Sequence, residues 1–334
     1  MIPIESTRGI PRDERPDQRV DGERVEIARP RVRAIVVSWN GAHLLPSCLR
    51  ALLSQAGPFS LSCVVVDNGS RDGTLELLAR DFPGVERLAL PENLGYGRAN
   101  NEALRDALGA GFDFALLLNN DVELEAGYLA ALLEAARAQP QAGLFTGTLL
   151  FRDPDADGTG ERVNSTGLVL DWFGRATDRD IHLPRAGLRR PDGPVDGVSG
   201  GAALLRCATL ARIGVFDPDY FAYYEDVDLS LRARAAGYQC WYAGAAIARH
   251  RFGATFGPGS PRQRYLLGRN HLRCAAAHLP PLRAAAVVAG TAAYRLALMT
   301  PLELLRGEPA LAAAEARAAG DGLLAALRAG WRRV

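Results

Sequence analysis

After a charged N-terminal stretch, short apolar runs alternate with segments of helical spacing. Continuous apolar runs are typical of strands buried on both faces, whereas Leu45, Leu49 and Leu52 recur at the spacing of one helix face. The pattern predicts strands at 33–38, 62–66, 85–90, 112–118 and 144–151, and helices at 44–53, 74–80, 96–108 and 126–138. Strands that alternate with helices of this length indicate an α/β fold with a mainly parallel central sheet flanked by helices.

The second half of the chain is less regular. Residues 152–195 are rich in Asp, Gly, Arg and Pro, so we expect loops and a few short antiparallel strands there. Small apolar residues and three glycines at 195–205 predict a close approach of the backbone to another group. We expect a helix at 225–236, whose acidic first turn suits the helix dipole, and one or two short strands at 238–248.

The two ends of the chain differ in charge and periodicity. Residues 1–30 are charged and have no apolar centre, which predicts a mobile tail without a signal peptide. From 261 to 334 we expect a basic helical extension, since residues 260–334 hold 11 Arg and 4 acidic residues. The apolar segment 282–298 contains Arg283 and Arg295, so we expect it to be too short and too charged to span a membrane. The extension either lies on an anionic membrane surface, caps the domain or forms a contact between copies of a homo-oligomer.

Composition narrows the function classes only slightly. A net charge of +1 gives no electrostatic reason to expect a nucleic-acid partner. The five cysteines have no CxxC spacing, so we expect reduced, mostly buried thiols in a cytoplasmic protein.

Polar residues follow four successive predicted strands, where ligands bind in an open α/β sheet. They are Asn40 after the first strand, Asp67 and Asn68 after the second, Gly95, Arg98 and Asn100 after the third, and Asn119, Asn120 and Asp121 after the fourth. Asp67 would accept a hydrogen bond from the imide of uracil or thymine, and Arg98 would reach a phosphate oxygen. The carboxylate of Asp121 suits Mg or Mn that holds a phosphate. Alternatively, residues 119–121 only turn the chain and cap the next helix.

The sequence lacks the signature motifs of two other classes of nucleotide-binding protein. The loop after the first predicted strand reads Ser38-Trp39-Asn40-Gly41, without the dinucleotide-binding glycine fingerprint. A Walker phosphate loop is excluded because the sequence contains no Lys.

Taken together, these motifs resemble the family 2 glycosyltransferases, and among them bacterial rhamnosyltransferase-like enzymes, over residues 33–278. The resemblance implies a GT-A type nucleotide-sugar-binding domain at 31–260, with a nucleotide-binding half at 31–151 and an acceptor-binding half at 152–260. It implies inverting transfer of a sugar, rhamnose in that branch, from a dTDP or UDP donor. The acceptor would be a hydroxyl of a lipid-linked or cell-surface polysaccharide, and the enzyme would work in the cytoplasm or at the inner membrane face.

The resemblance also assigns roles to single residues. Asp67 would read the nucleobase, and Asp121 would bind a divalent metal, Mg or Mn, on the donor diphosphate. Asn119 stands where the family usually has a first acid, which leaves one carboxylate, and His250 aligns with a histidine that completes the metal site in relatives.

The acceptor side carries the remaining roles that the resemblance implies. Asp226 would take the proton of the acceptor hydroxyl, with Glu225 in support, whereas Asp228 fits helix-dipole stabilisation better. Gly200 and Gly201 would border the donor sugar. The alternative is a catalytically weak nucleotide-sugar-binding module that serves as an assembly partner, as the Asn119 departure suggests. The complete acid pair at Glu225 and Asp226 argues for an enzyme.

Overall fold

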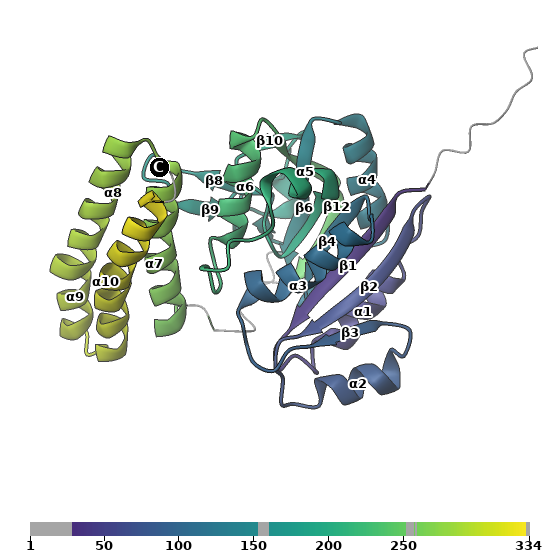
Figure 1. The fold of residues 1–334 in the computed structure, drawn as a ribbon, viewed down its shortest axis with the longest axis horizontal. Helices are drawn as coiled ribbons and strands as arrows, with labels where there is room; N and C mark the ends of the chain where they lie inside the picture. Colours follow the sequence, from purple (N-terminus) through teal and green to yellow (C-terminus); the bar gives the residue numbers. More distant parts are fainter. Residues whose placement is uncertain (1–28, 153–159, 252–256, 258, 332–334) are drawn as a thin grey trace, which may run out of the picture.

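The computed structural model describes residues 29–152, 160–251, 257 and 259–331 (Figure 1). The mobile tail predicted for residues 1–30 falls almost entirely outside the described residues. The described strands form one mixed sheet in the order β10-β12-β6-β11-β4-β1-β2-β3, with β5 paired to β12 and β7 to β6, and β8 and β9 form a separate pair. The strands are β1 (Arg31–Ser38), β2 (Ser60–Asp67), β3 (Glu86–Ala89), β4 (Phe114–Asn119), β5 (Val122–Leu124), β6 (Ala142–Phe151), β7 (Val163–Ser165), β8 (Leu168–Leu170), β9 (Ala176–Asp178), β10 (Gly193–Val195), β11 (Ala202–Arg206) and β12 (Gln239–His250).

The first half of the chain folds as its apolar pattern predicts. Strands β1, β2, β3 and β4 are parallel, and their register places Ser38 beside Asp67 and Val37 beside Asn119. Every strand and helix predicted in this half is present, with ends within two residues of those expected. The helices are α1 (Leu45–Leu53), α2 (Thr74–Asp81), α3 (Tyr96–Gly109) and α4 (Tyr128–Ala138).

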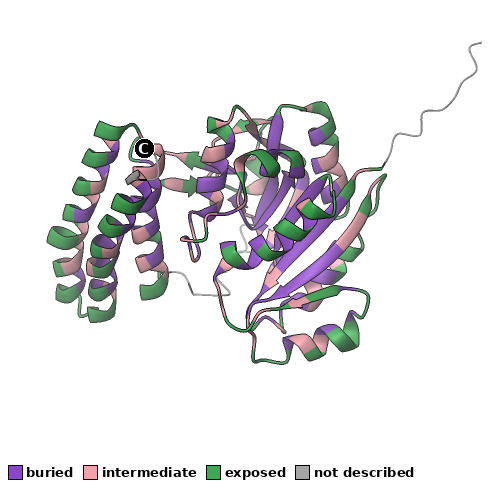
Figure 2. Cartoon of the chain, in the orientation of Figure 1, coloured by how far each residue is buried: buried purple, intermediate pink, exposed green. Residues whose placement is uncertain are grey.

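The central strands are buried on both faces, which explains their continuous apolar runs. Along β4, Leu116 and Leu118 pack with α1 and α4 in one core cluster, and Leu117 packs with residues of α3 in the other. Figure 2 shows these strands as the most completely buried part of the molecule.

Two strands in the middle of the fold were not predicted. β11 runs antiparallel between β4 and β6 within the expected glycine-rich stretch, and β5 pairs with the end of β12. The prediction that residues 119–121 cap a helix is wrong, because Asn120 and Asp121 form a turn that leads into β5 and α4 begins only at Tyr128.

The second half contains short strands, as its composition predicts. β7, β8, β9 and β10 each have three residues and pair antiparallel with a neighbour. Helix α6 (Glu225–Ala235) is present as expected, whereas α5 (Cys207–Ile213) was not predicted. The one or two short strands expected at 238–248 are a single strand, β12, which shifts register against β6.

The C-terminal helices form a bundle beside the sheet domain (Figure 1). It consists of α7 (Pro261–His278), α8 (Pro281–Tyr294), a π-helical turn (Arg295–Met299), α9 (Thr300–Leu305) and α10 (Pro309–Trp331). The expectation that segment 282–298 is too short and too charged for a membrane span needs correction. The helix continues to Leu305, and these 25 residues are long and apolar enough to cross a membrane by length and composition.

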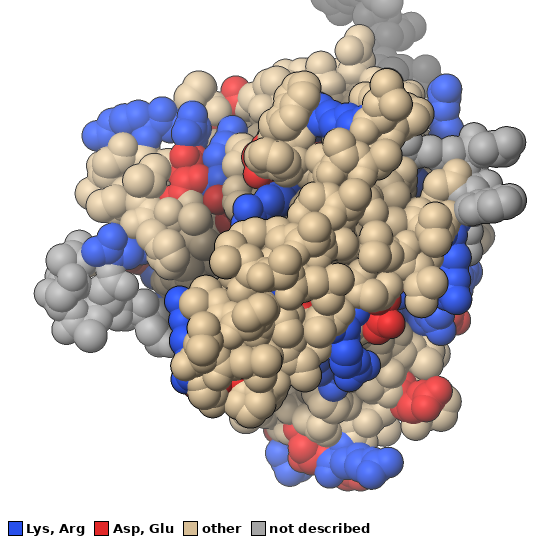
Figure 3. Space-filling view, turned by 90° about the vertical axis from the view of Figure 1, so that its left-hand side faces the viewer, with Lys and Arg blue, Asp and Glu red and all other residues tan. Residues whose placement is uncertain are grey.

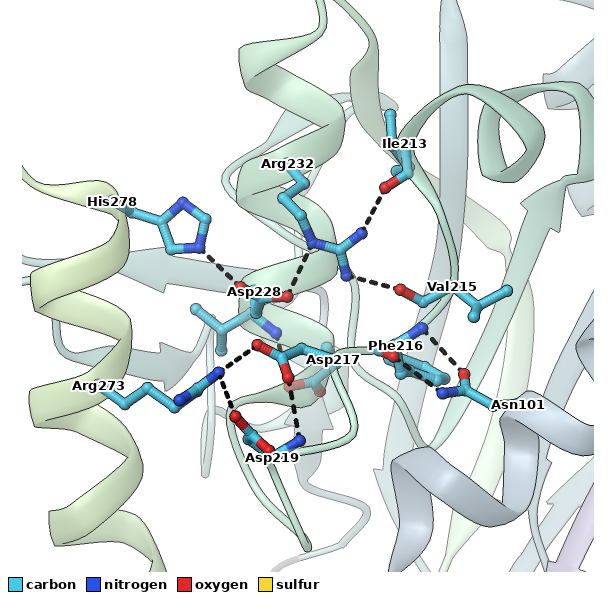
Figure 4. A network of polar contacts seen from close by, with 12 residues as sticks. Asn101, Ile213, Val215, Phe216, Asp217, Asp219, Asp228, Arg232, Arg273 and His278 are labelled. Atoms are coloured by element: carbon cyan, nitrogen blue, oxygen red, sulfur yellow. Dashed lines mark hydrogen bonds and ion pairs between the residues drawn. The ribbon is translucent and has the colours of Figure 1, made fainter. Parts of the chain in front are cut away.

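Polar contacts attach this bundle to the sheet domain (Figure 4). Asp228 of α6 accepts hydrogen bonds from Arg232 of its own helix and from His278 of α7, each at 2.8 Å. Arg273 of α7 pairs with Asp217 at 2.5 Å and with Asp219 at 3.0 Å. Because these partners come from elements far apart in the sequence, the network fixes α7 against α6.

Candidate active site

A cavity of about 400 Å³ opens beyond the carboxyl ends of β1 and β4 and at the start of α6. Its lining comes from both predicted halves of the domain and from helix α7. The residues predicted from the sequence that line it are Asn68, Gly95, Asn119, Asn120, Asp121, Gly200, Gly201, Glu225, Asp226 and His250.

Asn119 and Asn120 hold the end of β4 against neighbouring loops. The backbone N–H of Asn119 donates to the carbonyl of Gly201 at 2.9 Å, and the Asn120 amide donates to Ser38 Oγ at 3.1 Å. A Cβ atom on Gly41 would lie 2.1 Å from the Asn120 amide nitrogen, so a larger residue there would displace the Asn120 side chain. The amide of Asn120 is therefore engaged in the fold while it lines the cavity.

Asp121 lies next to His250, which the long strand β12 brings back from the far end of the domain. The His250 Nε2 atom is 3.2 Å from Asp121 Oδ1, and the pairing of β12 with β5 sets this approach. His250 Nδ1 lies 2.8 Å from the Asn164 side-chain oxygen. This contact orients the imidazole ring so that Nε2 is directed at Asp121.

The Asp121–His250 pair fits a divalent cation that also binds a ligand. Asp121 Oδ1 is buried and has no hydrogen-bond partner among the described residues. Hydrogen bonding of Nδ1 to a second group is the arrangement that orients metal-binding histidines. Within the described part of the chain, no three His, Cys, Asp or Glu side chains gather as a metal site. A cation here would thus need further oxygen ligands, as Mg²⁺ takes from substrate phosphates.

Glu225 and Asp226 enter the cavity from the first turn of α6. Tyr223 and Tyr224, directly before them, have φ angles of 67° and 72°, a left-handed conformation that bulky residues rarely adopt and that concentrates at functional sites. Asp226 Oδ2 accepts from the Gly200 N–H and Oδ1 accepts from the Val227 N–H, both at 2.8 Å. A Cβ atom on Gly200 would stand 3.3 Å from Asp226 Oδ2, so glycine permits this close approach.

Glu225 and Asp226 differ in pKa because their surroundings differ. Burial raises the pKa of Glu225 to about 8, and the neighbouring charge of Asp226 adds to this effect. Burial also raises the pKa of Asp226, but the N–H groups of Gly200 and Val227 oppose the shift by stabilising the carboxylate. We infer that Asp226 ionises first and that the last proton of the pair stays on Glu225.

Asp228 does not share this cavity. Although burial acts in the opposite direction, the hydrogen bond from His278 and the charge of Arg232 hold its pKa below the usual range. The carboxylate points to α7 (Figure 4), so its contacts join α6 to the bundle, and the helix-dipole role expected for it stays a prediction.

Asn68 and Gly95 join the loops at the edge of the cavity. The Asn68 side chain donates to Asn93 Oδ1 at 3.0 Å and accepts from the Leu94 N–H at 2.9 Å. Gly95 has φ +85°, and a Cβ atom there would lie 2.3 Å from the Phe221 carbonyl oxygen. This glycine therefore lets the first half of the chain touch the loop that precedes α6.

Four predicted nucleotide-binding residues lie outside the cavity lining. Asp67 is buried at the end of β2, and its Oδ1 has no hydrogen-bond partner among the described residues. Asn40 accepts from the Arg71 N–H, Arg98 donates to the Pro218 carbonyl and Asn100 donates to the Tyr96 carbonyl. Their assignment to the nucleotide stays a prediction.

The structure adds lining residues that sequence reasoning missed. Asp178, at the end of β9, faces the cavity, and burial raises its pKa to about 6 against a hydrogen bond with Ser165. Tyr96 donates its hydroxyl to the Gly200 carbonyl at 2.7 Å, and α7 contributes Gln263 and Leu267. Asp178 lies in the weakly periodic segment, where no pattern marks a site.

Comparison with known proteins agrees with this geometry. The model of the family described as "Glycosyl transferase family 2" matches residues 34–214, more than half of the chain. The chain is 34% identical over 215 residues to the N-acetylglucosaminyl-diphospho-decaprenol L-rhamnosyltransferase of Mycobacterium tuberculosis strain H37Rv. This match covers 60% of this chain and 69% of that protein.

Two solved structures share the fold at low sequence identity. The mannosyltransferase PcManGT from Pyrobaculum calidifontis, in complex with GDP-Man and Mn²⁺, matches with a TM-score of 0.54 and 20% identity over 88% of this chain and 87% of that one. GalNAc-T7 with UDP, GalNAc and Mn²⁺ matches with a TM-score of 0.59 and 13% identity. That match covers 75% of this chain and 48% of that one, so this chain spans about half of its length. Combining the family match with a mainly parallel sheet and a cavity beyond its strand ends, we conclude that the chain belongs to glycosyl transferase family 2 and is a glycosyltransferase of the GT-A fold.

Proposed function

We propose that the protein is an inverting rhamnosyltransferase. It would transfer the sugar from a dTDP or UDP donor to a hydroxyl of a lipid-linked diphosphate sugar, in cell-envelope polysaccharide synthesis. The relative named for rhamnosyl transfer to N-acetylglucosaminyl-diphospho-decaprenol supports this choice of substrates. The observation that carries the proposal is the buried Asp226 carboxylate, oriented by Gly200 in the same cavity as Asp121.

Asp226 is the proposed general base. It would take the proton of the acceptor hydroxyl as that oxygen attacks the anomeric carbon from the face opposite the leaving diphosphate. Each of its oxygens accepts one backbone hydrogen bond, so a further lone pair remains on each for the incoming proton. Glu225 would stay protonated at neutral pH, which avoids a second buried charge beside the base.

The proposed metal ligands are Asp121 and His250. A divalent cation held there would supply positive charge to the leaving diphosphate. With Asn119 in place of an acid, Asp121 gives the only carboxylate at residues 119–121. The solved structures of both structural relatives are complexes with Mn²⁺, which supports a cation in this fold.

The first experiment measures release of nucleoside diphosphate from dTDP- and UDP-sugars with a lipid-linked N-acetylglucosamine diphosphate acceptor. For D226N we expect kcat to fall about 10²- to 10⁴-fold, the usual range for loss of a general base. D81N changes an exposed carboxylate on α2 and serves as the matched control, with full activity expected. Full turnover by D226N would exclude Asp226 as the base.

The second experiment separates cation binding from turnover. We expect Mn²⁺ to raise the melting temperature of the wild-type protein in the presence of dTDP or UDP. In D121A and H250A that increment should disappear, while D81N should keep it. An unchanged Mn²⁺-dependent shift in both variants would refute the assignment of these ligands.

A further inference from the structure

The helix that runs from Pro281 to Leu305 presents an uncharged outer surface. Only 11% of the most apolar 18-residue stretch of this helix is buried. Figure 3 views this side of the molecule and shows a broad surface with few charged atoms. Leu282 and Leu305 are 89% and 86% exposed. The other large exposed side chains of this helix are Tyr294, Leu296, Leu298 and Leu304.

Two of the three charged residues of this helix, Arg295 and Glu303, are directed into the protein. Glu303 is 3% exposed and pairs with Arg264 of α7 at 3.4 Å, whereas Arg295 pairs with Glu315 of α10, itself 2% exposed. Arg283 stacks on the ring of Trp172 at 3.8 Å and donates to its carbonyl. Charges inside and leucines outside invert the arrangement that water favours.

Neighbouring elements extend this surface. Helix α10 packs against α8, the π-helical turn and α9, and its Leu324 and Leu327 are 56% and 61% exposed. Trp172, which Arg283 contacts at the start of α8, is 69% exposed. We call the exposed residues of 281–305 together with Leu323, Leu324 and Leu327 the outer bundle face. Exposed apolar surfaces of this extent mark interaction sites.

The exposed charge of the bundle is mainly positive. Arg306, Arg317 and Arg328 are exposed. Of the four acidic residues in 260–334, Glu303 and Glu315 are buried in ion pairs, Asp321 accepts a hydrogen bond from Tyr265, and Glu308 is exposed. An apolar surface with a basic border is the combination that binds membranes rich in anionic lipids.

We propose that the outer bundle face docks on the surface of a bilayer that contains anionic phospholipid, with the Pro281–Leu305 helix in the membrane plane. A span across the bilayer would separate Arg295 from Glu315 and Glu303 from Arg264 and expose these groups to hydrocarbon, which costs several kcal/mol. Insertion of the leucines to the depth of the headgroups leaves all of these pairs intact.

One helix connects the outer bundle face to the cavity. Helix α7 belongs to the bundle and also lines the cavity through Gln263 and Leu267. Docking would then hold the enzyme on the surface that carries its acceptor, a step that rests on the proposed lipid-linked acceptor.

The experiment is flotation of the full-length chain with vesicles of phosphatidylcholine alone or mixed with phosphatidylglycerol. We expect binding to the anionic vesicles, weakened at about 1 M salt because screening removes the arginine attraction. The double variant L298E/L305E should lower the partition coefficient at least about tenfold, since charged groups are costly in the bilayer. L53E is the matched control, because Leu53 is a similarly exposed leucine of α1 on the sheet domain, and it should bind normally.

Several outcomes would overturn the proposal. These are no flotation, equal flotation of L298E/L305E and wild type, or resistance to alkaline carbonate extraction, which would indicate a span. A dimer in solution that L298E/L305E dissociates, without vesicle binding, would assign the surface to a second copy. Melting temperature with and without dTDP or UDP checks folding of the variants, and donor hydrolysis without lipid tests the proposed function separately.

Discussion

At the scale of single residues, two acids three positions apart on α6 respond to pH in opposite directions. Folded Glu225 keeps its proton up to about pH 8, whereas the ordinary carboxyl pKa is 4.5. Its contribution to folding stability therefore falls as the pH rises between these values. Asp228 has a lowered pKa, so its contribution is present above the unfolded pKa and is lost as the pH falls through the folded one.

This difference predicts two distinct pH profiles. Relative to wild type, E225Q should gain unfolding free energy steadily between about pH 5.5 and 8.5, since it removes a charge that must be buried at high pH. D228N should instead lose about 1–3 kcal/mol at neutral pH, because its buried partners are left unsatisfied, and approach wild type in acid. Urea unfolding from about pH 3 to about pH 8.5 measures both, because the D228N difference disappears only near the low pKa of Asp228. A pH-independent E225Q difference would contradict the assignment of the proton to Glu225.

At the scale of elements, buried ion pairs hold the C-terminal helices together. Glu315 of α10 contacts Arg264 of α7 and Arg295 of the π-helical turn, and its side chain is 2% exposed. We expect E315Q to lower the unfolding free energy by about 3–5 kcal/mol, the usual cost of breaking a buried pair. E134Q removes the exposed Glu134–Arg137 pair of α4 and should change it by less than about 1 kcal/mol. Equal denaturation midpoints for E315Q and E134Q would show that the bundle does not depend on this pair.

At the scale of the whole molecule, the predicted boundary at residue 260 does not coincide with the edge of the site. Helix α7 lines the cavity, and Asn270 donates to the carbonyls of Ala222 and Tyr223, both at 2.8 Å. These are the loop residues that direct Glu225 and Asp226 into the cavity.

We therefore expect a chain truncated after residue 260 to lose the increase in melting temperature that dTDP or UDP gives the full chain. A chain truncated after residue 330 leaves α7 intact and should keep this response. Calorimetry of both chains is the measurement. Unchanged nucleotide binding by the shorter chain would establish 31–260 as an independent unit.

The amino-acid sequence by itself determined the strands of the first half and most of the polar residues that we propose to act in the cavity. The strands are buried on both faces, so their apolar runs are local signals. Asn119, Asp121, Glu225 and Asp226 lie at the end of a strand or open a helix, where function is expected without long-range information.

Only the tertiary structure decided the features that depend on contacts between residues far apart in the sequence. β5 has three residues and exists through its pairing with β12, which also brings His250 to Asp121. The outer bundle face likewise could not be predicted, because only the packing of α7, α8 and α10 turns Arg295 and Glu303 inward and leaves the leucines outside.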